Sequence, residues 1–171
     1  MKRFATLAFA AAAAAIPLSA FGHEGMLHEG CPAGQSFAAG DISVTGAFTR
    51  AMLPSAPVGG GYMTISNGGS MPDRLVGATT EATDTVEFHD MKVEGGMMNM
   101  IPMPEGVEIP AGGTVTFAPG GLHVMFLKPR APFKEGECLE VVLQFERAGE
   151  LSVQLSVGPV GADAAPEGHH H

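Results

Sequence analysis

The chain has 171 residues, of which 45% are hydrophobic, and its formal net charge is −9 at pH 7. That length fits one domain of ordinary size with its own hydrophobic core. The acidic balance argues against nucleic acids and anionic membrane surfaces as partners.

Residues 1–22 have the pattern of a secretory signal peptide. Lys2 and Arg3 provide the positive start, residues 5–16 form the apolar run, and Ala20-Phe21-Gly22 is a small-x-small cleavage site. An apolar run of this length is too short to anchor a protein in a bilayer. We therefore expect export to the periplasm as a soluble protein, with no membrane insertion after cleavage and a mature charge that is more negative by two.

Two flanking segments, residues 23–40 and 159–171, are rich in Gly, Ala, His and Pro and show no periodicity. We expect both to be flexible and to lie outside the folded domain.

The region between them, residues 41–158, is predicted to be a single all-β domain. Short β-prone runs separated by Gly, Pro, Asn and Asp occur at 41–50, 60–66, 73–80, 84–91, 96–101, 114–118, 122–128, 138–146 and 150–158. Strict alternation along the last two runs places one face of each strand in a core. Many short strands joined by turns indicate an antiparallel sandwich or a Greek-key barrel.

Two cysteines, Cys31 and Cys138, belong to a chain bound for an oxidising compartment, where they can form a disulfide. The sequence does not show whether the two sites come close, so both the paired and the free state stay open. Cys138 is a poor candidate for a blue-copper ligand, because the next histidine after it is His169.

Methionine and histidine recur in a pattern that suggests soft-metal binding. There are two H-x-M pairs, His89 with Met91 and His123 with Met125, and further methionines at Met97, Met98, Met100 and Met103. A thioether is soft, uncharged and never protonated, so together with imidazole it suits copper(I). The alternative is that methionine serves as an adaptable core filler.

Strand alternation supports the metal-binding interpretation. In each run the H-x-M pair lies on the face opposite the core-facing residues. Two residues separated by one position on a strand are about 6.5–7 Å apart, so two long side chains can reach one ion.

At this point the sequence resembles the periplasmic copper chaperones of the PCu(A)C family, whose motif is a histidine, a methionine and an H-x-M pair. Ten residues separate His89 from Met100, and 22 separate Met100 from His123-Val124-Met125, one more than the family spacing. Glycine- and proline-rich segments at 56–63, 108–113 and 119–123 also match, so the resemblance covers residues 41–158.

The resemblance implies a cupredoxin-like Greek-key β-sandwich that binds one copper(I) through four residues. These are His89, Met100, His123 and Met125, with Met91 as an auxiliary or exchange ligand. It implies a monomeric chaperone that delivers copper by ligand exchange toward the CuA centre of cytochrome c oxidase. The acceptor would be the CuA-bearing subunit or a thiol-disulfide copper-transfer helper.

The other candidate residues receive weaker roles. Met97, Met98 and Met103 either line the copper route or pack. Glu87 and Asp90 are interpreted as solvated carboxylates, because hard oxygen suits copper(I) poorly.

The flanking segments suggest a secondary copper(II) site, because imidazoles and a free amine suit that ion. Its candidate ligands are His23, Met26, His28, His169, His170 and His171. A leader without metal and a leftover purification tag are the alternatives.

Other functional classes fit the sequence less well. An enzyme is not expected, because there is no G-x-S-x-G nucleophile elbow and only two histidines lie in the predicted domain. An adhesion-type sandwich would leave the ligand pattern unexplained. A periplasmic copper buffer or scavenger is the nearest alternative, since storage and delivery use the same ligands.

Overall fold

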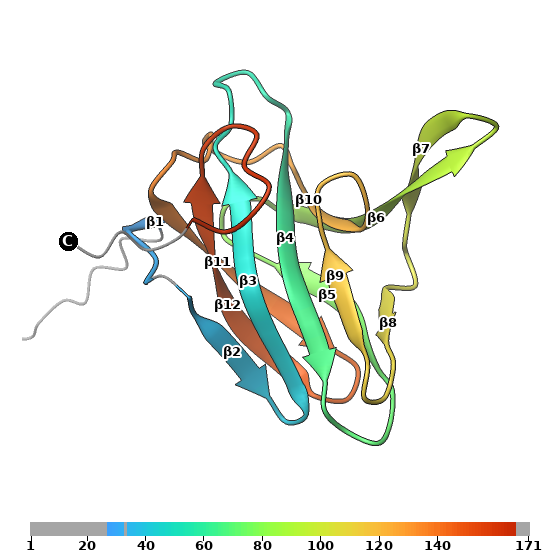
Figure 1. The fold of residues 1–171 in the computed structure, drawn as a ribbon. Coiled ribbons are helices and arrows are strands. Elements are labelled where there is room, and N and C mark those ends of the chain that lie inside the picture. Colours follow the sequence, from blue (N-terminus) through green and yellow to red (C-terminus); the bar gives the residue numbers. More distant parts are fainter. Residues whose placement is uncertain (1–26, 33, 167–171) are drawn as a thin grey trace, which may run out of the picture.

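The computed structural model describes residues 27–32 and 34–166, and every regular element in those residues is a strand (Figure 1). The strands are β1 (Leu27–Glu29), β2 (Ser36–Ala39), β3 (Ile42–Arg50), β4 (Val58–Asn67), β5 (Asp73–Thr79), β6 (Thr85–Glu94), β7 (Met97–Pro102), β8 (Val107–Ile109), β9 (Thr114–Phe117), β10 (His123–Leu127), β11 (Glu137–Phe145) and β12 (Gly149–Gly158). The predicted single all-β domain is confirmed. No helix in the described residues is long and apolar enough to cross a membrane.

All strands belong to one hydrogen-bonded sheet that folds over itself. The main order is β7-β6-β10-β4-β3-β12-β11-β5-β8, with β1 on β11, β2 on β3 and β9 on β4. Strands β12 and β3 pair in parallel, and the other pairings are antiparallel. Figure 1 shows β3 and β4 in one layer, with β5 and β11 behind them. This arrangement encloses one core, as expected of a sandwich.

The core confirms the alternation read from the sequence. Leu139, Val141, Leu143 and Phe145 of β11 are buried, and so are Leu151, Val153, Leu155 and Val157 of β12. Burying an aliphatic or aromatic side chain of this size contributes about 1.5–3 kcal/mol, so these two strands contribute much of the hydrophobic stabilisation.

The flanking segments differ from expectation. Residues 23–40 were expected to lack regular structure, yet β1 and β2 lie within them. The sequence signal is weak because β1 has three residues and β2 alternates only between exposed and half-buried positions, which gives no hydrophobic period. The three-residue strand β8 was missed for the same reason.

The C-terminal segment is attached to the domain as far as the structure describes it. Arg50 donates a hydrogen bond to the Ala162 carbonyl oxygen (2.7 Å) and forms an ion pair with Asp163 (3.0 Å). Residues 159–166 contain no strand, as expected. The predicted signal peptide at residues 1–22 lies outside the described residues.

Cys31 and Cys138 form a disulfide, which decides the question that the sequence left open. Their Cα atoms are 5.1 Å apart although 107 positions separate them in the chain. Cys138 lies on β11 and is buried. The bridge therefore holds the N-terminal segment against the edge where β1 pairs with β11.

Strands β6 and β7 form a hairpin that extends beyond the body of the sheet (Figure 1). Its turn is Gly95-Gly96, with φ values of 60° and 81°, which glycine adopts without strain and which suit a two-residue type I′ turn. Strand β10 pairs with β6 only up to His89. Residues 90–101 therefore form a projecting hairpin in which β6 pairs with β7 alone.

Candidate metal centre

The two histidines of the H-x-M pairs lie directly opposite each other. His89 on β6 and His123 on β10 are register partners, and their ring centroids are 5.9 Å apart with the planes inclined by 37°. A metal about 2.0 Å from an imidazole nitrogen lies about 3.2 Å from the ring centroid, so two rings on one ion have centroids at most about 6.4 Å apart. The observed spacing therefore allows both rings to bind one ion.

Hydrogen bonds decide which nitrogen of each ring is available. His123 Nδ1 lies 2.9 Å from the carbonyl oxygen of Gly121. A carbonyl only accepts, so Nδ1 carries the proton and Nε2 keeps its lone pair. His89 Nε2 lies 2.8 Å from Glu87 Oε2. The carboxylate accepts that proton, so His89 offers Nδ1.

His89 Nδ1 is buried and has no hydrogen-bond partner in the described structure. Leaving a buried polar atom unpaired costs about 1–3 kcal/mol, which makes such atoms rare in native folds. A bound metal would satisfy this nitrogen. A histidine that binds metal with one nitrogen and donates to a carboxylate with the other is a recurrent arrangement in metal sites.

The methionines follow the histidines in register along the same face. Met125 lies opposite Glu87, two register positions before the histidines. Met91 lies opposite Met100, two register positions beyond His89 on the projecting hairpin. Positions two apart on a strand share a face, so all these side chains extend from one face. Met91 and Met125 are half-buried, and Met100 is 48% exposed.

His123 is more enclosed than the sequence suggested. Alternation places it opposite the core-facing Val124, which is confirmed, but an outward-facing ligand was expected to be partly exposed, and His123 is only 9% exposed. In the sheet, β10 lies between β4 and β6, so both of its edges are covered by neighbouring strands. The His89 side chain is similarly covered, at 12% exposure.

Glu87 has a contact that the sequence interpretation missed. It was expected to be a solvated carboxylate and is 46% exposed, yet it binds His89. The signal was present, because Glu87 and His89 are two positions apart on one strand and so share a face. Asp90 lies on the opposite face of β6, across from Ile101.

The remaining methionines divide into two groups. Met103 packs against the core, which favours the structural role. Met97 and Met98 are exposed on the projecting hairpin. Within the described residues, no three His, Cys, Asp or Glu side chains are grouped as a metal site would require. The histidine pair would therefore need methionine sulfur to complete its coordination.

Most candidates for the secondary copper(II) site lie outside the described residues. These are His23, Met26, His169, His170 and His171. His28 lies on β1 in register with Cys138.

The fold is that of a class of domain seen in solved structures of PCuAC proteins. The apo PmoF2 PCuAC domain has a TM-score of 0.65 and 28% identity over 77% of this chain and 100% of that one. The copper-bound PCuAC domain from PmoF2 has a TM-score of 0.63 and 28% identity, over 73% and 98%. The CuI-DR1885 solution structure from Deinococcus radiodurans has a TM-score of 0.56 and 31% identity, over 72% and 80%.

Residues 42–157 match the model of the LpqE-like family, described as "Putative lipoprotein LpqE-like", and the chain belongs to that family. It is also similar to "Putative lipoprotein Lxx21020" of Leifsonia xyli subsp. xyli, with 33% identity over 93 residues. That alignment spans about half of each protein, 54% of this chain and 56% of the relative. The predicted resemblance to PCu(A)C proteins is confirmed at the level of the fold.

Proposed function

We propose that this protein is an exported copper(I) chaperone. It binds one ion through His89, Met100, His123 and Met125 and delivers it by ligand exchange. The observation that carries this proposal is the pairing of His89 with His123 in register, with a buried and unpartnered nitrogen on His89. Met91, next to His89 on the same face, is the auxiliary ligand.

The ligand chemistry favours copper(I). Two imidazoles and two thioethers are neutral and include soft donors, whereas Zn²⁺, Ca²⁺ and Mg²⁺ gain little from thioether sulfur. Two similar solved structures, the copper-bound PCuAC domain from PmoF2 and CuI-DR1885, support the same metal.

The difference in exposure among the ligands suggests an order of exchange. Met100 is 48% exposed, whereas His123 is buried. An incoming thiolate or thioether of the acceptor therefore displaces Met100 first and the imidazoles last. Copper(I) enters and leaves without a change of oxidation state, and no catalytic chemistry is proposed for the protein.

The compartment and the acceptor belong to the same proposal. The predicted signal peptide, together with relatives described as lipoproteins, supports export to the periplasm. The expected acceptor is the CuA-bearing subunit of cytochrome c oxidase, or a thiol-disulfide helper that acts before it. The secondary copper(II) site in the flanking segments stays a prediction.

Anaerobic copper(I) titration against a competing chromogenic chelator tests the binding step. We expect His123→Ala to lower the affinity at least about a hundredfold, because it removes a direct ligand, and loss of a residue that only hydrogen-bonds to a ligand already costs about 10–100-fold. Its thermal unfolding should stay cooperative, because the side chain faces away from the core. Unchanged affinity in a folded His123→Ala variant would contradict the assignment.

A copper-transfer assay distinguishes a copper chaperone from a copper buffer. The copper-loaded chain is mixed with a copper-free CuA domain, and the metal in each protein is measured after separation. Movement of copper to the CuA domain supports delivery. Tight binding without movement would favour the alternative, a periplasmic copper buffer.

A further inference from the structure

The projecting hairpin carries methionines that no packing role explains. Met98 and Met100 of β7 are 58% and 48% exposed, so neither fills a core. Met100 pairs with Met91, and Met98 pairs with Val93, the next residue of β6 on the same face. Met91, Met98 and Met100 therefore extend the face of the histidine pair toward the end of the hairpin.

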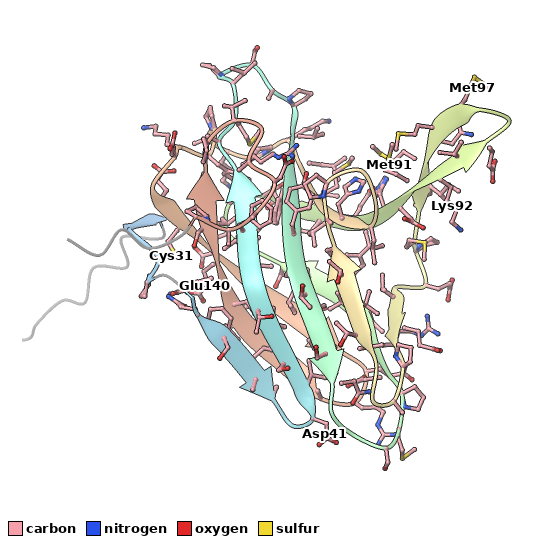
Figure 2. The ribbon with its side chains drawn as sticks, in the orientation of Figure 1. Cys31, Asp41, Met91, Lys92, Met97 and Glu140 are labelled. Atoms are coloured by element: carbon pink, nitrogen blue, oxygen red, sulfur yellow. A yellow bond between two sulfur atoms is a disulfide. The ribbon has the colours of Figure 1, made fainter. Side chains whose placement is uncertain are left out.

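Charge is separated between the two faces of this hairpin. The charged residues of β6 occupy the alternate positions and so lie on the face opposite the histidines: Asp90, Lys92 and Glu94. Figure 2 shows Met91 and Lys92 extending from opposite sides of the hairpin. The methionine face therefore offers a metal ion uncharged thioether donors, with no carboxylate between His89 and the turn.

The positions are close enough for one ion. Met98 and Met100 are two apart on β7, which places their Cα atoms about 6.5–7 Å apart. Met91 lies directly opposite Met100, a pairing that brings Cβ atoms within about 4.5–5.5 Å. Methionine is unbranched with three rotatable side-chain bonds, so the three sulfurs can converge.

The residue type points to a metal rather than to a protein partner. A docking surface for an apolar partner needs only hydrophobic area, which Leu, Ile or Phe would supply as well as Met. On this face, the paired positions beyond the histidines hold Met91, Met98 and Met100, with Val93 as the one other side chain. Thioether sulfur is the property that these three residues share and that aliphatic residues lack.

We propose that Met91, Met98 and Met100 form a second, outer copper(I) site. An ion passes through it on its way to the histidine pair, and Met100 serves both positions. In the inward step, the bonds to Met98 and Met91 sulfur break as bonds to the two imidazole nitrogens and to Met125 sulfur form, Met100 stays bound, and copper stays copper(I). This inference rests on the proposed function and adds the entry position.

The test is an anaerobic copper(I) titration of the whole chain with its methionine methyl groups labelled with ¹³C. The first equivalent should shift the methyl signals of Met125 and Met100. The second should shift Met91 and Met98, which hold the outer ion while Met100 stays on the inner one. Met97, which is 68% exposed but pairs with Glu94 on the other face, should not move.

Met98→Leu and Met97→Leu form a matched pair, because both remove an exposed sulfur from the same strand. We expect Met98→Leu to weaken binding of the second equivalent at least about tenfold and Met97→Leu to change it less than about twofold, the scale on which metal-site changes act. A Met98 signal that stays fixed through two equivalents while the first still binds would overturn the outer site and leave the hairpin as an apolar contact surface. Failure of the first equivalent to bind would instead count against the proposed function.

Discussion

At the scale of single residues, the centre depends on which nitrogen of His89 is free. Residue type and spacing predicted both histidines and the methionines beside them. The acceptors at Glu87 and Gly121 were not predicted, because a hydrogen bond of a ring nitrogen depends on side-chain rotamers and a loop carbonyl. These two contacts leave His89 with Nδ1 and His123 with Nε2.

Glu87 is a positioning residue that acts through His89. Replacing it with alanine removes the acceptor of Nε2–H, so the ring can exchange tautomers and Nδ1 is no longer always the free nitrogen. We expect Glu87→Ala to lower copper(I) affinity about tenfold, as for other losses of a hydrogen bond to a metal-binding histidine. Histidine-ring ¹⁵N NMR of the copper-free protein should show the altered tautomer.

Two variants separate this role from a general charge effect. Glu87→Gln keeps a carbonyl acceptor and should recover most of the affinity. Glu94→Ala removes a carboxylate from the opposite face of the same strand and should leave both the affinity and the ring signals unchanged. An equal loss of affinity in Glu94→Ala would show that charge, and not the contact with His89, is responsible.

At the scale of elements, strand β4 shows where composition misleads. The sequence placed its start at residue 60, but the strand begins at Val58, because glycine is depleted in strands and three occur here in a row. The structure explains two of them. A Cβ on Gly59 would lie 2.8 Å from the Phe133 ring, and one on Gly61 would lie 2.9 Å from Phe126. The strand passes so close to these buried rings that only glycine fits.

Gly61→Ala tests this close approach. The added methyl group would meet both Phe126 and Leu155 in a core without spare room, and overpacking typically costs about 1–3 kcal/mol. We expect a lower denaturant midpoint for Gly61→Ala. Gly68→Ala is the control, since its nearest neighbour would be an Asp41 oxygen at 3.7 Å. Equal midpoints for the two variants would show that the core adapts.

At the scale of the whole molecule, the pairing of strands far apart in the chain was the feature hardest to predict from the sequence. Alternation gave the strands and their faces, but not the parallel contact of β12 with β3 or the pairing of β1 with β11. Both depend on chain-distant partners that leave no local signal. The disulfide belongs to the same category, since only the folded sheet brings Cys31 to Cys138.

Removing the disulfide should lower stability without affecting copper(I). The bridge restricts a loop of about 100 residues in the unfolded chain, worth up to about 4–5 kcal/mol in the chain-entropy model, and losing a native disulfide typically costs about 2–5 kcal/mol. Strands β4, β3 and β12 separate β10 from β11, and Figure 2 shows Cys31 on the side away from Met91.

The double variant Cys31→Ser/Cys138→Ala avoids free thiols that could themselves bind copper. Equilibrium denaturation measures its stability, and the chelator competition described above measures its affinity. A drop in copper(I) affinity at temperatures where the variant stays folded would show that the bridge supports the metal centre after all.

The register between β6 and β10 also links copper binding to the stability of the protein. A slip of one residue would move one histidine of the pair to the other face. The two histidines come from different strands, so only the folded sheet brings them together. The unfolded protein therefore lacks the histidine pair, so copper(I) binds this centre only in the folded state. Each tenfold excess of free copper over the dissociation constant then adds about 1.4 kcal/mol to the free energy of unfolding. The copper-bound protein is therefore more stable than the copper-free protein. Each delivery of copper leaves a protein that unfolds more easily until it binds copper again.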